Sequence, residues 1–194
     1  MATVFYVTHP QVRIDPSIPV GAWGLSETGR MRAEAAATTG WTGNAGRILS
    51  SAETKAVETA QILARPLWLP VQVRQDLHEN DRTSTGFLPP EEFERVADAF
   101  FAQPNDSVRG WERAIDAQAR IVRAFDEELA RDSGDRDVII AGHGAVGTLL
   151  MTHLLGQAIS RALDQPTGGG NVFAFDRDSR RVLHRWKPLE EMAR

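Results

Sequence analysis

Two apolar segments of the sequence each run almost directly into a histidine. Residues 4–7 (Val-Phe-Tyr-Val) precede His9 by one position, and the segment 137–141 (Asp-Val-Ile-Ile-Ala) is followed by Gly142 and His143. Short apolar runs rich in β-branched and aromatic residues are typical of buried β-strands. The carboxyl ends of parallel strands meet at one edge of a sheet, where α/β proteins bind their ligands. The sequence therefore predicts two imidazoles close together at that edge.

Strand-like and helix-like segments alternate along the rest of the chain. Further strands are expected at 47–50 and 71–73, and helices after Ser26, over 51–64 with Ser51 as the cap, from Pro90, and along a stripe of Ile115, Val122, Phe125 and Leu129. Residues 171–175 and 181–186 are typical of a hairpin. This order predicts an α/β three-layer sandwich, in which a mostly parallel central sheet carries helices on both faces and a C-terminal antiparallel edge hairpin. We expect residues 1–194 to form a single domain.

Composition excludes several classes of protein. The net charge of −4 argues against a nucleic-acid-binding protein, which usually carries a basic surface. The chain has no cysteine, so disulfides and thiolate sites are excluded. No apolar stretch approaches the roughly 20 residues of a membrane helix, and no signal-like segment opens the sequence. We expect a cytoplasmic protein that binds neither nucleic acid nor membranes.

Other polar residues are expected at the same sheet edge as the two histidines. Ser51 ends one strand and precedes a helix that carries Lys55, and Glu79 follows the third strand. Gly144 follows His143 at the expected start of a helix, whose free N–H groups and partial positive charge favour an anion. Two imidazoles, a carboxylate, an ammonium group and helix N-termini together fit phosphoryl transfer through a histidine.

Five segments, in this order, resemble the histidine phosphatase superfamily, also called phosphoglycerate mutase-like. They are "FYVTHPQV" at the place of a strand leading into Arg-His-Gly, "WGLSETGRMRAEAAA", "ILSSAETKAVETAQILA" at the place of Ser-Ser-x-x-x-Arg-Ala-x-x-Thr-Ala, "DLHEND" where the acid is supplied, and "VIIAGHGAVGTLL" at the second histidine. Each segment alone is a weak signal, but five in register span nearly the whole chain. The resemblance implies the fold expected above.

The resemblance also implies roles for individual residues. His9 would be the nucleophile that forms phosphohistidine, and Glu79 would protonate the leaving oxygen and later activate water. His143 would stabilise charge on the phosphoryl oxygens. Lys55 and Gly144 would bind phosphate. The family resemblance implies no metal and no cofactor, and its substrate would be a small phosphorylated molecule.

The chain departs from the family at two positions of the first motif and at one position of the third segment. Thr8 replaces an arginine, Pro10 replaces a glycine, and Lys55 replaces a second arginine. A guanidinium group binds phosphate with a planar fork, whereas lysine offers a point charge and threonine only a hydroxyl. Arg13 or Arg82 would be able to fill the gap beside Thr8. The expected phosphate-binding set is therefore Lys55, Thr8, Arg13 and Gly144, with Arg82 as an alternative.

Other interpretations remain open from the sequence alone. A family member that has lost catalysis would serve as a phosphate-binding or regulatory module, and the changes at Thr8 and Lys55 favour this. A metal hydrolase would use His9, His143 and Glu79 as ligands. Lys55 would also be explained as the ion-pair partner of Glu53 or Glu58. The edge hairpin would allow a second copy of the chain to pair with it as a homodimer.

Overall fold

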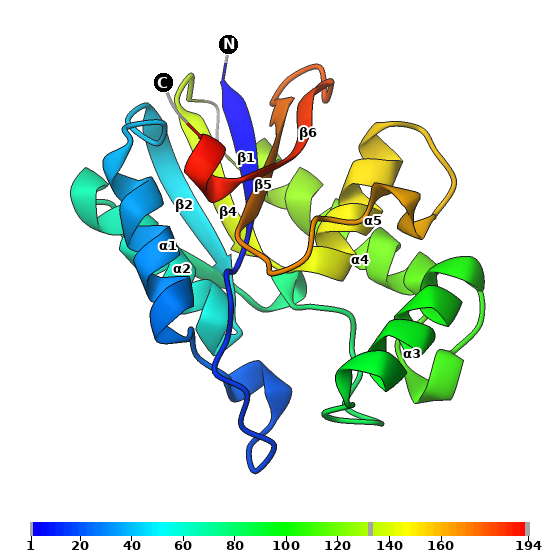
Figure 1. Ribbon diagram of the computed structural model, residues 1–194. Helices are drawn as coiled ribbons and strands as arrows, with labels where there is room; N and C mark the ends of the chain where they lie inside the picture. The colour runs from blue at the N-terminus through cyan, green and yellow to red at the C-terminus, as the bar shows by residue number, and fades with distance from the viewer. Residues whose placement is uncertain (1, 132–133, 193–194) are drawn as a thin grey trace.

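The computed structural model describes residues 2–131 and 134–192, which form a six-stranded sheet in the order β3-β2-β4-β1-β5-β6 (Figure 1). The strands are β1 Thr3–Thr8, β2 Ala45–Ser51, β3 Val71–Arg74, β4 Asp137–Gly142, β5 Asn171–Asp176 and β6 Val182–Pro188. The α-helices are α1 Glu27–Thr38, α2 Thr54–Ala64, α3 Pro90–Ala102, α4 Ala114–Ala130 and α5 Gly144–Leu154.

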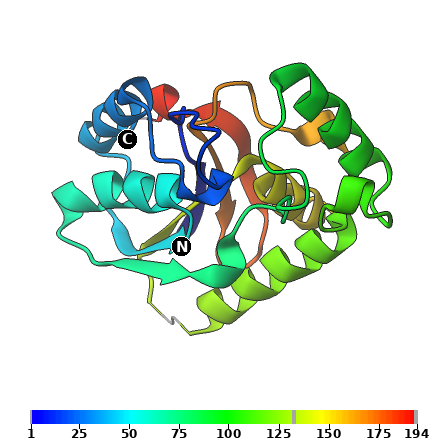
Figure 2. The same cartoon turned by 90° about the horizontal axis from the view of Figure 1, so that it is seen from below.

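The sheet is mostly parallel, as the sequence predicts. β4 pairs in parallel with β1 and β2, and β2 pairs in parallel with β3. β5 runs antiparallel to β1, and β6 antiparallel to β5, so the predicted C-terminal hairpin is confirmed. Helices α1 and α2 cover one face, and α4 and α5 cover the other (Figures 1 and 2). The predicted α/β sandwich is therefore the observed architecture.

The continuous apolar run in β4 follows from its central place in the sheet. Successive side chains of a strand point to opposite faces. Val138 and Ile140 pack into the core on the α4 and α5 side, and Ile139 and Ala141 into the core beneath α1 and α2. All four are fully buried. A strand covered on both faces has no position for a solvated side chain, which explains why the run contains no alternation.

Two details differ from the sequence-based expectation. Ile115 is 39% exposed, because the buried stripe of α4 is built on Ala114, Ala117 and Ile121 instead. Ile115 lies one position off that stripe, about 100° around the helix. Ser51 is not the N-cap of α2, which begins at Thr54 after Glu53. In contrast, Ser26 caps α1 as expected, accepting a hydrogen bond from the Gly29 N–H.

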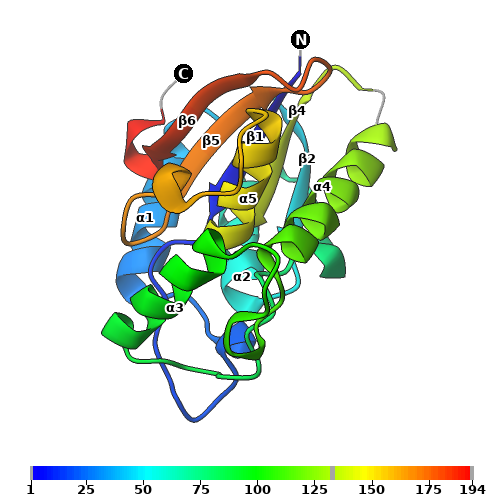
Figure 3. The ribbon, with the colours of Figure 1, turned by 90° about the vertical axis from the view of Figure 1, so that its right-hand side faces the viewer.

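The carboxyl ends of the parallel strands lie together at the lower end of the molecule in Figure 1, beside α3. Seen from the side, α4 and α5 lie against the sheet and α3 lies beyond their lower ends (Figure 3). None of the described helices is long and apolar enough to cross a membrane. β6 stands at the edge of the sheet, and pairing of this edge with a second copy stays a prediction.

Tyr6, the single tyrosine of the chain, connects β1 to the residue that follows β4. Its fully buried hydroxyl donates to the carbonyl oxygen of His143 and accepts from the His143 N–H, each at 3.0 Å. Burial raises the pKa of this hydroxyl, so it stays a donor at all ordinary pH values. A side chain at Gly142 or Gly147 would overlap the Tyr6 ring or hydroxyl. Tyr6 therefore fixes the backbone of His143.

We predict that Tyr6→Phe lowers the free energy of unfolding by about 1–3 kcal/mol, because the buried N–H of His143 loses its partner and the His143 carbonyl keeps only the bond from the Gly147 N–H. Urea denaturation measures the loss. Native-state hydrogen exchange locates it: the amide of His143 should exchange faster, while that of Ile140 within β4 should change only with global stability. An unchanged unfolding free energy would contradict the role given to the Tyr6 hydroxyl.

Candidate active site

His9 leaves β1 with its backbone held from two sides. Its N–H donates to the Gly142 carbonyl at 3.1 Å, and its carbonyl accepts from the Gly170 N–H at 3.0 Å. Gly169 has φ of +62°, and a side chain there would overlap the His9 carbonyl, so this position requires glycine. Gly169 and Gly170 thus both contact the backbone carbonyl of the predicted nucleophile.

The His9 side chain has a defined tautomer. Its Nδ1 lies 2.8 Å from the Pro10 carbonyl oxygen, which can only accept, so Nδ1 carries the proton and Nε2 keeps its lone pair. Burial, aided by the charge of Lys55, lowers the His9 pKa to about 4. The imidazole is therefore neutral at pH 7. This is the state in which Nε2 can act as a nucleophile.

His143 lies beside His9, as the sequence predicts. The two rings are 5.3 Å apart between centroids and nearly perpendicular. His143 is fully buried, its Nε2 is 2.8 Å from Ser51 Oγ, and its Nδ1 has no hydrogen-bond partner within the described residues. Burial lowers the pKa of His143 well below its usual value, against the opposing effect of Glu53.

Glu79 reaches the N-terminus of α5. Its carboxylate accepts hydrogen bonds from the N–H groups of Ala145 at 3.2 Å and Val146 at 3.1 Å. Burial nevertheless raises the pKa of Glu79, with the negative charge of Glu53 adding to the effect and Arg82 opposing it. A carboxyl group with a raised pKa can hold a proton at a pH where other carboxylates have lost theirs. The N–H of Gly144, one residue earlier, makes no hydrogen bond within the described residues.

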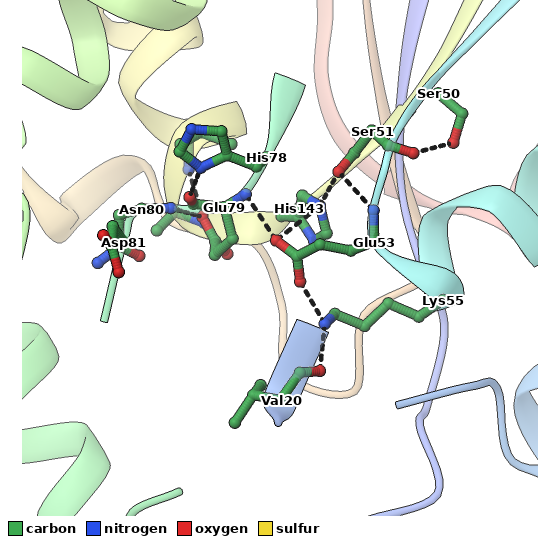
Figure 4. A network of polar contacts seen from close by, with 12 residues as sticks. Val20, Ser50, Ser51, Glu53, Lys55, His78, Glu79, Asn80, Asp81 and His143 are labelled. Carbon is green, nitrogen blue, oxygen red and sulfur yellow. Dashed lines mark hydrogen bonds and ion pairs between the residues drawn. The ribbon is translucent and has the colours of Figure 1, made fainter. Parts of the chain in front are cut away.

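Glu53 is the residue of this site that sequence reasoning missed, except as a partner for Lys55. Its Oε2 accepts from Lys55 Nζ at 2.5 Å, and its Oε1 accepts from the Glu79 N–H at 2.9 Å and lies 3.5 Å from His143 Nε2 (Figure 4). Burial opposes its ionisation, but neighbouring His143 and Lys55 lower the Glu53 pKa to about 2. The signal in the sequence that would have identified Glu53 is its place two residues before Lys55.

Lys55 does not line the cavity that contains His9. Its side chain is 3% exposed, and Nζ donates to the Val20 carbonyl at 2.9 Å in addition to Glu53. The ion-pair explanation of Lys55 that the sequence left open is therefore observed with Glu53. Glu58 instead bonds the Leu25 N–H and pairs with Arg30.

Thr8 is fully buried, and its hydroxyl already has partners. It donates to Gln165 Oε1 at 2.6 Å and accepts from the Asn171 N–H at 2.9 Å. Asn171 Nδ2 in turn donates to Gln165 Oε1 and to the Pro166 carbonyl. Where the family has an arginine, this chain therefore has a small side chain that anchors the wall of residues 165–171.

Two cavities open at this end of the sheet. One, of about 590 Å³, is lined by the segment 78–83 together with Val20 and Glu53, and the other, of about 380 Å³, contains His9, Gly144 and the glycines at 168–169. Glu79, Asn80 and Arg82 line both. Of the four residues predicted to bind phosphate, only Gly144 lines a cavity. Arg13 is exposed and lines neither.

A metal site was one of the sequence-based alternatives. Within residues 2–131 and 134–192, no group of three or more histidine, aspartate and glutamate side chains is arranged to hold a metal ion. The three ligands of that alternative make separate hydrogen bonds instead: His9 with Pro10, His143 with Ser51, and Glu79 with the start of α5. The metal-hydrolase alternative therefore has no ligand set in this part of the chain.

Comparison with known proteins identifies relatives of this arrangement. A sequence profile of the histidine phosphatase superfamily (branch 1) matches residues 19–187, beginning after the Thr-His-Pro segment. None of the curated proteins matches the sequence significantly.

Three solved structures share the fold of this chain over nearly its whole length. Bacillus stearothermophilus YhfR has a TM-score of 0.79 and 22% identity, over 95% of each chain. A mycobacterial glucosyl-3-phosphoglycerate phosphatase has a TM-score of 0.74 and 23% identity, over 96% of each chain. The α-ribazole phosphatase from Shigella flexneri has a TM-score of 0.76 and 16% identity, over 98% of this chain and 97% of the other.

We predict that Glu53→Gln lowers the free energy of unfolding at pH 7 by about 3 kcal/mol, since it leaves the buried Lys55 ammonium without its counter-charge. The Glu53 pKa is about 2 in the folded protein against an ordinary value of 4.5, so its ionised form stabilises the fold. The difference between wild type and variant should be complete above about pH 4.5 and shrink as the pH falls towards 2.

Urea denaturation at several pH values measures this difference. Glu58→Gln, in the helix that Glu53 precedes, is the matched control, because Glu58 pairs with the more exposed Arg30 and its loss should cost less. The double variant Glu53→Gln, Lys55→Met should recover much of the loss. A difference that does not depend on pH would contradict the assigned role of Glu53.

Proposed function

Because the chain belongs to the histidine phosphatase superfamily (branch 1), we propose that it is a metal-independent phosphomonoesterase acting through a phosphohistidine on His9. The observation that carries the proposal is the state of His9. A hydrogen bond fixes its proton on Nδ1, its pKa is lowered to about 4, and its ring lines a cavity. A neutral imidazole with a free lone pair in a cavity is suited to attack an electrophile.

In the first step, Nε2 of His9 attacks the phosphorus atom, and the bond from phosphorus to the leaving oxygen breaks. The protonated carboxyl of Glu79 gives its proton to that oxygen, and the alcohol product leaves. In the second step, Glu79 as a carboxylate takes a proton from water, the water oxygen bonds to phosphorus, and the bond to Nε2 breaks. The raised pKa of Glu79 supports its use as the acid.

Hydrogen-bond donors are needed where charge develops on the phosphoryl oxygens. The N–H of Gly144 at the start of α5 is suited to this role, because Gly144 lines the cavity that contains His9. The unpartnered Nδ1 of His143, whose side chain is fully buried, is a second candidate donor. The Tyr6 hydroxyl contributes to this arrangement indirectly, because its two hydrogen bonds hold the backbone of His143.

A second candidate is a family member that binds a phosphorylated ligand without turning it over. The observation that favours it is the pairing of Lys55 with Glu53, together with the burial of the Thr8 hydroxyl. These contacts occupy both positions at which the family resemblance implies phosphate-binding arginines. Measurement of turnover separates the two candidates.

The substrate class of the proposal is a small phosphomonoester. The similar structures named above include phosphatases of glucosyl-3-phosphoglycerate and of α-ribazole phosphate, which shows that this fold accommodates different organic groups. In this chain the cavity beside His9 has a volume of about 380 Å³ and includes Phe93 and Ala97 of α3. A small molecule with an apolar portion fits such a site.

We predict that wild-type protein hydrolyses p-nitrophenyl phosphate without added metal, and that His9→Ala abolishes turnover because no other side chain replaces the nucleophile. Release of p-nitrophenol measures the rate. His153→Ala is the control, since His153 is exposed near the C-terminus of α5. Activity retained in His9→Ala would refute the phosphohistidine mechanism, and a folded wild type without turnover would favour the binding module.

We predict a bell-shaped dependence of kcat/KM on pH. The acid limb should have an apparent pKa near 4 instead of 6.5, because activity is lost only when the buried His9 takes up a proton. The basic limb should follow deprotonation of Glu79, and Glu79→Gln should remove it while slowing the release of poor leaving groups most. An acid limb near pH 6.5 would contradict the burial effect on His9.

A further inference from the structure

Arg82 is the cation that the site leaves available. Its half-buried side chain lines both cavities, together with Glu79 and, in the smaller one, His9. Its guanidinium lies 4.9 Å from the centroid of the Phe93 ring, a cation–π distance. Arg82 forms no ion pair with any carboxylate of the described residues, unlike most arginines near it.

The other cations near the site are occupied. Lys55 is buried and bonded to Glu53 and to the Val20 carbonyl. Arg161 also lines the smaller cavity, but its guanidinium is shared by Glu94, Asp98 and Asp164. A phosphate bound by either group would have to displace a carboxylate. Arg82 requires no such exchange.

The segment that carries Arg82 has a fixed backbone. Buried Arg120 donates to the carbonyl oxygens of Asp76 and His78 and pairs with Glu112. Glu112 in turn bonds the backbone of Asp81 in both directions, donating from its N–H and accepting at its carboxylate. The Arg82 carbonyl accepts from the Gly86 N–H, which closes the turn. The backbone from which the Arg82 side chain extends is therefore held in place by hydrogen bonds.

The charge of Arg82 also acts on the groups of the proposed reaction. It is the largest charge effect on Glu79, whose pKa it acts to lower against the effect of burial. It acts in the same direction on His9 and His143, where Lys55 has the larger effect.

We propose that the guanidinium of Arg82, and not the ammonium of Lys55, binds the phosphoryl oxygens of the substrate beside His9. This inference rests on the proposed function, because it assigns a residue to the same site. Arg82 supplies from the loop after β3 the planar, two-pronged donor that is missing at Thr8. It touches the reacting phosphoryl group and is therefore a catalytic residue of the proposed reaction.

The test compares wild type with Arg82→Ala and Arg82→Lys, using inorganic phosphate as the probe in calorimetry and p-nitrophenyl phosphate for turnover. Arg82→Ala should bind phosphate about 10- to 100-fold more weakly and lose on the order of 100-fold in kcat/KM. Arg82→Lys should lie between, because it keeps the charge but not the fork. Arg95→Ala is the matched control, an exposed arginine of α3 that lines neither cavity.

Binding and turnover together separate this inference from the proposed function. Phosphate binding that depends on Arg82, in a wild type without turnover, would support Arg82 and refute the phosphatase. Turnover and phosphate affinity unaffected in Arg82→Ala would refute Arg82 and leave the phosphatase standing. A wild type that binds no phosphate, or a loss of affinity in Arg13→Ala but not in Arg82→Ala, would also overturn the inference. Urea denaturation of each variant confirms that it is folded.

Discussion

The register between β1 and β4 decides where both histidines stand. Thr8 pairs with Gly142, and a histidine follows each of these two residues in the sequence. The two imidazole rings therefore lie 5.3 Å apart between centroids. The His9 N–H extends the same ladder by one hydrogen bond to Gly142. A shift of one residue would turn every side chain of the strand to the opposite face. Val138 and Ile140 would then leave the core that they fill on the α4 and α5 side, and Ile139 and Ala141 the core on the α1 and α2 side, so packing on both faces of the sheet holds the register that brings the imidazoles together.

Around this pair, the charges are arranged differently from what the family resemblance implies. Glu53 accepts from Lys55 and from the backbone of Glu79, so one carboxylate connects the start of α2 to the loop after β3. The buried ammonium of Lys55 thus forms an internal ion pair, and the Thr8 hydroxyl forms hydrogen bonds to Gln165 and Asn171. Two arginines line the cavities, and of these Arg161 pairs with carboxylates whereas Arg82, a loop residue, forms no ion pair within the described residues. Thr8 and Lys55, the positions at which the resemblance implies phosphate-binding arginines, both make internal contacts in this structure.

The sequence predicted the sheet, the layers and the edge hairpin because periodicity and strand composition are local properties that burial then reinforces. It also predicted that His9, His143 and Glu79 would meet, since each follows a parallel strand or a turn at the same edge. It left the partner of Lys55 open between Glu53 and Glu58 and did not predict the contacts of Glu53 with Glu79 and His143, because these depend on rotamers and on segments distant in sequence. The same holds for Ile115 and for Arg13: a single apolar or basic residue does not reveal which way it points, and both are exposed.

Gly169 lies so close to the carbonyl of His9 that the glycine segment 168–170 and the end of β1 are in direct contact. Since Gly170 also bonds that carbonyl, the glycine segment cannot swing outward without pulling the end of β1 with it. Thr8 fastens the same segment through Gln165 and Asn171. Val20 lines the larger cavity and not the one that contains His9. Substitution at Val20 would therefore change the shape of the larger cavity while leaving in place the hydrogen bonds that hold the His9 backbone.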